Sequence, residues 1–261
     1  MSEAGPAVPG AATDARWRLD GRVALVTGAS AGLGARFARV LYGAGAHVIA
    51  TARRADRLEE LARDCGTRIQ TIAGDVTDPH HRQALVESLR PHGRLDVLVN
   101  NAGVCDDGPL ERQGLDDLRR VVEVNLISVL DLCRLTADLL RAAPAASVIN
   151  VASMYGVVAS RGPLAAYNAT KAALINLTRH LAAIWGQDGV RVNALAPGYF
   201  PTALSGFLAD PGFAQSIRDR TLLGRTPALD ELDGPLLFLA TDASSYVTGQ
   251  ALVVDGGWTA V

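Results

Sequence analysis

Short apolar runs rich in β-branched residues alternate along this chain with longer segments whose apolar residues recur at helical spacing. The runs predict strands over 22–27, 47–51, 69–74, 95–100, 147–153, 190–196 and 251–255. The longer segments predict helices over 32–45, 55–65, about 79–90, about 115–141 and 163–186. Continuous apolar strands separated by helices are typical of a parallel sheet covered on both faces. The pattern therefore predicts an α/β fold with a doubly wound parallel sheet of about seven strands.

No internal repeat or linker divides the pattern, so we expect a single domain over 19–261. Residues 1–18 are rich in Ala, Gly and Pro, which predicts a disordered tail, and they lack the basic and apolar stretches of a secretion signal. Doubly wound sheets bind ligands beyond the carboxyl ends of their strands. The chemistry is therefore expected where each strand ends.

The composition is that of an ordinary globular protein: 49% of the 261 residues are hydrophobic, 20% are charged and the net charge is −2. This balance argues against a nucleic acid or an anionic membrane as partner, and no apolar run is long enough to span a membrane. The cysteines at 65, 105 and 133 are scattered, so we expect reduced thiols in the cytoplasm and no metal site. Of the 25 basic side chains, only Lys171 is a lysine.

The turn after the first strand reads TGASAGLG over residues 27–34. Glycine here lets the backbone approach a pyrophosphate, and the following helix turns free N–H groups toward it. We therefore expect a nucleotide cofactor at this turn and a fold of the Rossmann type. The cofactor-binding residues expected in the turn are Gly28, Ser30, Ala31, Gly32, Leu33 and Gly34.

Tyr167 precedes the sole lysine by four residues, so both side chains project from one face of a predicted helix. A tyrosine hydroxyl can donate a proton, but its reference pKa near ~10 makes it a poor acid–base group at neutral pH. A neighbouring ammonium favours the phenolate, and a planar guanidinium cannot replace that compact charge. The alternative is chance, which would place one of five tyrosines at this spacing roughly one time in fifty.

The G-x-x-x-G-x-G spacing of the turn, together with Tyr167-x-x-x-Lys171, resembles the short-chain dehydrogenase/reductase family, in its 3-oxoacyl-reductase-like and sugar-dehydrogenase-like branch. Further motifs follow in the family's order: DV at 75–76, NNAG at 100–103, Asn125, Ser153, PG at 197–198 and VTGQALVVDGG at 247–257. The resemblance covers about 20–258. It implies an oxidoreductase that transfers a hydride between a nicotinamide cofactor and a ketone or secondary alcohol.

The resemblance also implies a catalytic set of Asn125, Ser153, Tyr167 and Lys171. Tyr167 is the expected general acid/base, Lys171 binds the nicotinamide ribose, Ser153 binds the substrate oxygen and Asn125 holds a water in a proton relay. On the residues alone, Ser153 could cap a helix and Asn125 could bond the backbone. Ser153 and Tyr167 are 14 residues apart, whereas close relatives more commonly have 13, which predicts a reshaped pocket wall.

The end of the second strand bears on the choice between NAD and NADP. NAD-preferring relatives place a carboxylate where this chain has Ala52, and the following Arg53 and Arg54 suit the 2′-phosphate of NADP. The alternative is that these arginines are a solvated helix start. Ala31 argues against NADP, because that position is often basic in NADP-preferring relatives. We expect NADP, with NAD as the alternative.

The remaining cofactor contacts come from the ends of later strands. The resemblance places Asp75 and Val76 at the adenine and Thr202 at the nicotinamide carboxamide. The others expected are Asn101, Ala102, Gly103, Pro197 and Gly198.

The stretch 199–228 is expected to roof the substrate pocket, with the loop 104–110 on another side. In that loop, Asp106 and Asp107 either bind substrate hydroxyls or lie in solvent. A lone basic residue, Arg141, before the fifth strand argues against acyl carrier protein as partner. A sugar, polyol, steroid or other ketone/alcohol pair fits equally well. The apolar residues that would form a lid, or simply pack on the sheet, are Tyr199, Phe200, Leu204, Phe207 and Leu208.

Three hypotheses remain open at this point: an NADP-dependent carbonyl oxidoreductase, an NAD-linked sugar, polyol or alcohol dehydrogenase, and a non-catalytic nucleotide-sensing protein of the same fold. A complete catalytic set argues against the third. The resemblance also implies a homotetramer or dimer built on helices 115–141 and 163–186 and the last strand. Apolar residues that would serve such contacts are Leu126, Val129, Leu130, Leu177, Leu181 and Ile184.

Overall fold

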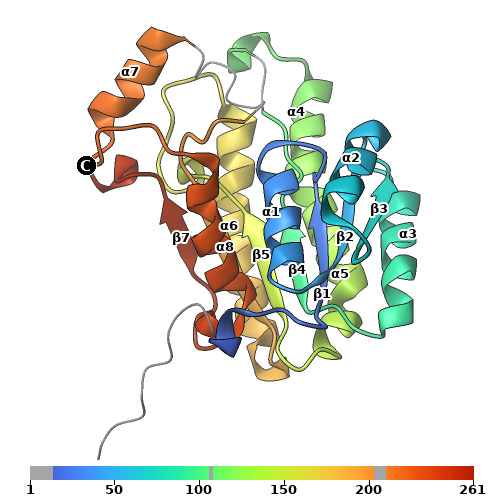
Figure 1. Ribbon diagram of the computed structural model, residues 1–261. Helices are drawn as coiled ribbons and strands as arrows, with labels where there is room; N and C mark the ends of the chain where they lie inside the picture. Colours follow the sequence, from blue (N-terminus) through green and yellow to red (C-terminus); the bar gives the residue numbers. More distant parts are fainter. Residues whose placement is uncertain (1–13, 106–107, 203–209) are drawn as a thin grey trace, which may run out of the picture.

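A single sheet of parallel strands forms the centre of the molecule in the computed structural model, which describes residues 14–105, 108–202 and 210–261 (Figure 1). Within these residues the sheet has seven strands in the order β3-β2-β1-β4-β5-β6-β7. Every neighbouring pair is parallel, which confirms the predicted fold class. The strands are β1 (Val23–Thr27), β2 (His47–Ala52), β3 (Ile69–Ala73), β4 (Val97–Asn100), β5 (Ser147–Val151), β6 (Arg191–Pro197) and β7 (Ala251–Val254).

Helices cover both faces of the sheet, as the apolar strands require (Figure 1). Side chains alternate along β1, so Ala24 and Val26 belong to one buried cluster and Val23 and Leu25 to the other. The first cluster is closed by α1 (Gly32–Gly43), α2 (Ala55–Cys65) and α8 (Asp233–Ala240). The second cluster is closed by α3 (Pro79–Leu89), α5 (Ser128–Arg141) and α6 (Ala165–Trp185).

The helix expected over 115–141 is continuous but not uniform. It begins as α4 (Leu115–Val122), widens into a π-helical segment (Glu123–Ile127) and continues as α5. Asn125 lies inside the π-helical segment and is fully buried. Such segments hold one extra residue in a turn and are frequent at functional sites.

Helix α7 (Pro211–Arg220) was not among the predicted elements, and neither was α8. Asp210 begins α7, because its side chain accepts a hydrogen bond from the N–H of Phe213, and Pro211 follows at the first helical position. This helix lies beyond the carboxyl ends of the strands (Figure 1). It belongs to the predicted roof, although Leu204, Phe207 and Leu208 lie outside the described residues.

The predicted disordered tail of 1–18 includes residues that are folded against the domain. Residues 1–13 lie outside the described part of the chain, but Ala15–Trp17 form a turn of 3₁₀ helix that Asp14 caps. The ring of Trp17 lies 6.4 Å from that of Phe238 on α8. Residues 14–18 therefore pack against the domain, because an indole ring offers a large apolar surface to bury.

Two of the residues expected at contacts between subunits belong to the core. Val129 is 3% exposed and Leu181 is 7% exposed, and both belong to the second buried cluster described above. Leu130 and Ile184 are exposed to 40% and 51%. Among the described residues, we find no helix with both the length and the apolar character that crossing a membrane requires.

Candidate active site

The carboxyl ends of the strands open into a cavity of about 960 Å³. The strand order reverses between β1 and β4, and the cavity lies over this switch point, where doubly wound sheets bind their ligands. Every residue predicted to bind the cofactor lines it. These are Gly28, Ser30, Ala31, Gly32, Leu33, Gly34, Arg53, Arg54, Asp75, Val76, Asn101, Ala102, Gly103, Tyr167, Lys171, Pro197, Gly198 and Thr202.

The turn after β1 needs glycine at two positions. Gly28 has a positive φ of 71°, a backbone conformation that residues with a side chain rarely adopt. A Cβ on Gly34 would lie 2.3 Å from the carbonyl oxygen of Gly28, so α1 can approach the strand only without a side chain there. The N-terminal end of α1 consequently faces the cavity with its free N–H groups, which is the arrangement that binds phosphates.

The ends of β1 and β4 are fastened together by side chains. The hydroxyl oxygen of Thr27 accepts hydrogen bonds from the N–H groups of Asn101 and Ala102, both at 3.0 Å. The side-chain amide of Asn101 donates to the carbonyl oxygen of Thr27 at 2.9 Å. These contacts hold the ends of the two strands together at the cavity.

Ser153 and Tyr167 are hydrogen-bonded beyond β5, on the other side of the β1–β4 pair from Arg53 and Arg54, which follow β2. Ser153 follows β5 rather than ending it, and it caps a short 3₁₀ helix (Met154–Gly156) by accepting from the N–H of Tyr155 at 3.1 Å. Burial raises the pKa of Tyr167 to about 12, and a hydrogen bond with Ser153 acts in the opposite direction. The hydroxyl of Tyr167 is therefore protonated at neutral pH and can serve as a proton donor.

Lys171 is buried beneath Tyr167, with only 4% of its surface exposed. Its Nζ donates to the carbonyl oxygen of Val151 at 2.7 Å and lies 5.5 Å from the centre of the Tyr167 ring. Burial lowers the pKa of Lys171 to about 8. Burial of the phenol dominates the pKa of Tyr167 here, and the expectation that the ammonium favours the phenolate stays a prediction.

Asn125 stands behind the wall of the cavity. Its Oδ1 accepts from the N–H of Val104 at 2.8 Å, and its Nδ2 donates to the carbonyl oxygen of Val104 at 2.9 Å. The Nδ2 also donates to Thr170 at 3.2 Å. The structure thus gives this side chain the backbone-bonding role that was the alternative at the sequence level, and its part in a proton relay stays a prediction.

The predicted adenosine end of the cavity carries both signs of charge. Partial burial acts to raise the pKa of Asp75, but hydrogen bonds from Thr77 and the nearby charge of Arg53 hold it below its ordinary value. Arg54 donates to the hydroxyl of Ser30 at 3.0 and 3.2 Å. Both arginines are exposed at the rim, so their guanidinium groups are available to a ligand.

Thr202 lies against the glycine turn. Its Cβ and Cγ2 are each 3.3 Å from the point that a Cβ on Gly32 would occupy. The predicted contact of Thr202 with the carboxamide of the nicotinamide is not tested by this placement. Asp106 and Asp107 lie outside the described residues.

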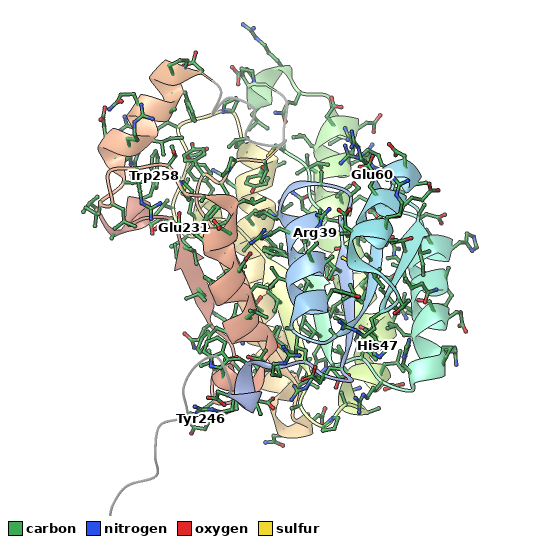
Figure 2. The ribbon with its side chains drawn as sticks, viewed as in Figure 1. Arg39, His47, Glu60, Glu231, Tyr246 and Trp258 are labelled. Carbon is green, nitrogen blue, oxygen red and sulfur yellow. The ribbon has the colours of Figure 1, made fainter. Side chains whose placement is uncertain are left out.

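Aromatic side chains form a wall of the cavity that sequence reasoning found only in part. The hydroxyls of Tyr155 and Tyr199 lie 2.5 Å apart, and the ring of Tyr199 stands edge-on to Phe213 of α7 and to Trp258. Figure 2 shows Trp258 beside α7. Tyr199 was predicted as a lid residue, but Tyr155 was missed. Its position two residues after Ser153, in the stretch with the unusual 14-residue spacing, was the available signal.

Comparisons with known proteins agree with this geometry. Residues 28–259 match a family model described as enoyl-(acyl carrier protein) reductase. Cis-4-hydroxycyclohexanecarboxylate dehydrogenase from Sinomonas cyclohexanicum is 39% identical over 245 residues, which are 92% of this chain and 97% of that protein. Gluconate 5-dehydrogenase from Gluconobacter oxydans (strain 621H) is 36% identical over 249 residues, which are 92% and 96% of the two chains. The crystal structure of a gluconate 5-dehydrogenase from Burkholderia cenocepacia J2315, in complex with NADP and tartrate, matches with a TM-score of 0.88 at 37% identity, covering 94% of this chain and 98% of that one.

The lowered pKa of Lys171 predicts a pH-dependent stability. Between about pH 8 and the ordinary lysine value of 10.5, the unfolded chain holds a proton that the folded chain has lost, so the stability of the native protein rises with pH in that window. Lys171→Met removes the group and this dependence. The unfolding free energy of the wild type minus that of the variant should increase by roughly 1.4 kcal/mol per pH unit.

Urea unfolding of both proteins from about pH 8.5 to about pH 10 measures this difference. Arg57→Met is the control, because it removes an exposed arginine that does not titrate in this range. The difference in unfolding free energy between the wild type and Arg57→Met should not change with pH. A difference between wild type and Lys171→Met that stays constant with pH would show that the ammonium is not destabilised by burial.

Proposed function

The chain belongs to the short-chain dehydrogenase/reductase family and is an oxidoreductase, and we propose that it transfers a hydride between NADP(H) and a small ketone or secondary alcohol. The observation that carries the proposal is one cavity with a glycine turn and arginines at one end and Ser153, Tyr167 and Lys171 at the other. A pure nucleotide sensor has no need of the buried tyrosine and lysine, which argues against the third hypothesis.

Each catalytic side chain has a role that its surroundings support. The bound nicotinamide supplies or accepts the hydride. Ser153 donates a hydrogen bond to the substrate oxygen, and Tyr167 gives that oxygen a proton during reduction or takes one during oxidation. The phenolate that remains after reduction is stabilised by the ammonium of Lys171, which is largely protonated at pH 7 because its pKa is about 8.

NADP rather than NAD is the proposed cofactor. Arg53 and Arg54 stand at the rim where the adenosine ribose is expected, and no carboxylate is present at Ala52 to bind a 2′-hydroxyl. A solved relative contains NADP. An exposed guanidinium forms charge-assisted hydrogen bonds with the 2′-phosphate of NADP. The 2′-hydroxyl of NAD is uncharged and cannot form such bonds.

Hydroxy acids are the substrates to test first. The names of two relatives specify gluconate and a hydroxycyclohexanecarboxylate, which both carry a secondary alcohol and a carboxylate. Ketones without a carboxylate, 3-oxoacyl thioesters, sugars and simple secondary alcohols complete the panel.

Tyr167→Phe removes one hydroxyl and should lower kcat by about 10²–10⁴-fold without weakening cofactor binding, because the proton donor is lost while the ring remains. Steady-state turnover over the panel, with NADP(H) and NAD(H), and NADPH titration by fluorescence measure the two quantities. Tyr246→Phe is the matched control, since Tyr246 is fully exposed at the other end of the sheet (Figure 2). Undiminished turnover in Tyr167→Phe would rule out the assigned role.

Arg53→Ala should weaken NADPH binding by about tenfold or more and leave NADH binding unchanged, because only NADPH carries the 2′-phosphate. Dissociation constants for the two cofactors give the answer directly. Arg57→Ala is the control, since Arg57 lies on α2, which begins just after Arg53 and Arg54, and is paired with Glu60. Full NADPH affinity in Arg53→Ala would favour the NAD-linked alternative.

A homotetramer or dimer is proposed for the assembled enzyme. Exposed apolar side chains on neighbouring helices support it: Ile127 and Leu130 on the α4–α5 helix and Ile184 on α6. The enzyme is proposed to act in the cytoplasm, where the unpaired buried thiols of Cys65 and Cys133 would stay reduced. Sedimentation at micromolar concentration should give two or four times the 27.3 kDa chain mass, and a monomeric mass would contradict the proposal.

A further inference from the structure

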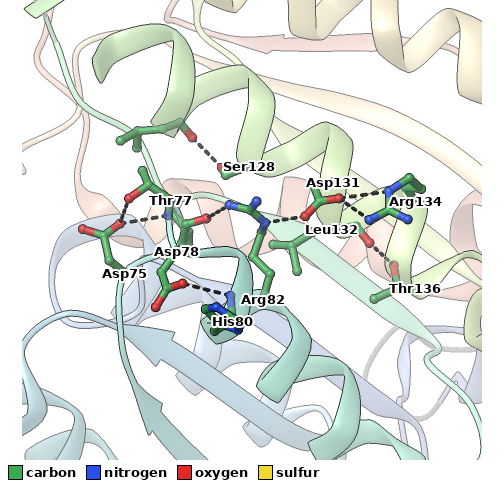
Figure 3. Close-up of polar contacts among 12 residues, drawn as sticks. Asp75, Thr77, Asp78, His80, Arg82, Ser128, Asp131, Leu132, Arg134 and Thr136 are labelled. Carbon is green, nitrogen blue, oxygen red and sulfur yellow. Dashed lines mark hydrogen bonds and ion pairs between the residues drawn. The ribbon is translucent and has the colours of Figure 1, made fainter. Parts of the chain in front are cut away.

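Arg82 is a charged residue buried where an apolar one would pack. It lies in the second turn of α3, and its side chain is 6% exposed. Replacing a buried ion pair by apolar residues is often neutral or stabilising, so stability alone does not account for an arginine here. Its contacts point instead to the turn that follows β3 (Figure 3).

The two ends of the guanidinium bind two different elements. Nη1 donates to the carbonyl oxygen of Val76 at 2.6 Å, and Nε donates to Oδ2 of Asp131 on α5 at 2.6 Å. Arg134 binds the other oxygen of the same carboxylate, at 2.7 and 3.0 Å. Partial burial acts to raise the pKa of Asp131, but the two arginines hold it below its ordinary value, so the carboxylate is a fixed negative charge.

The turn that Arg82 holds follows the edge strand of the sheet. Strand β3 is at the edge of the sheet, and among residues 14–105, 108–202 and 210–261 it pairs with β2 alone. Within the turn, Asp75 accepts hydrogen bonds from the N–H and the hydroxyl of Thr77, both at 2.9 Å. These bonds shape the turn, and the N–H of Gly74 donates to the carbonyl oxygen of Ala52 at 2.9 Å, which fixes the start of the turn to the end of β2. The Arg82 contact fixes the next part of the turn, because it ties the carbonyl of Val76 to Asp131 on α5.

We propose that Arg82 is a positioning residue for the adenine of the cofactor. By holding the carbonyl of Val76 at a set distance from α5, it keeps the side chains of Asp75 and Val76 against the cavity that both line. The inference rests on the proposed function, which places the adenine at these two residues. Arg82 itself does not line the cavity.

Binding of cofactor fragments tests the proposal without requiring turnover. Calorimetry with 5′-ADP and 2′,5′-ADP reports the adenosine end, and calorimetry with reduced nicotinamide mononucleotide reports the other end. Arg82→Met should bind both adenosine fragments about tenfold more weakly and bind the mononucleotide as the wild type does. Arg82→Lys keeps the charge but has a single donor group, so it should give intermediate affinity for the adenosine fragments.

Arg134→Met is the matched control, because Arg134 binds the same carboxylate but is 71% exposed and does not touch the turn. It should bind all three fragments as the wild type does. If Arg82→Met does not fold, Asp131→Asn carries the comparison, since it loosens the anchor of Arg82 while preserving the size of the side chain.

Equal affinity for the adenosine fragments in wild type and variant would overturn the role of Arg82. Equal weakening of all three fragments would also overturn it, because that result indicates a general structural defect. Failure of the wild type to bind any of the fragments would instead count against the proposed nucleotide site itself.

Discussion

The contact between α1 and the end of β1 is the constraint on which the site depends. A methyl group on Gly34 would lie 2.3 Å from the oxygen of Gly28 and 2.5 Å from the amide of Asn101, so helix and strand meet with no space to spare. Asn101 in turn directly follows β4, and Thr27 fastens it to the end of β1. The phosphate-binding end of α1 and the two central strands therefore form one rigid corner, and the rest of the cavity is built outward from it.

Much of the fold and the site follows from the sequence because both are periodic or local. Seven apolar runs separated by helical segments specify a parallel sheet, and a parallel sheet brings all strand ends to one edge. Residues as distant in sequence as Gly28 and Gly198 thereby meet in one cavity. Helix α7 was missed because a short segment of mixed polarity gives weak periodicity. Helix α8 was missed because its sequence, DGPLLFLA, is apolar on every side after Gly and Pro and so shows no helical alternation. The π-helical turn around Asn125 leaves no signal in the apolar pattern that distinguishes it from ordinary helix.

Electrostatic behaviour was the least predictable aspect. The spacing of Tyr167 and Lys171 correctly placed them together, but the sequence does not reveal how deeply each is buried. Desolvation shifts both groups toward their neutral forms, which raises the pKa of the phenol and lowers that of the amine. Arg82 illustrates the same limit, since one arginine among 24 carries no mark of being buried until α3 and α5 are packed together.

The order of strands separates the part of the site that sets cofactor preference from the part that performs the reaction. The adenosine end rests on β2 and β3 at the margin of the sheet, while Ser153 follows β5 and Lys171 bonds to it from beneath. Arg53 and Arg54, which follow β2, are exposed, so their substitution disturbs few buried neighbours, whereas β5 is buried throughout and substitutions near it disturb the interior. Cofactor preference can thus drift over evolutionary time while the reaction chemistry is conserved, and engineers can treat the two as separate modules.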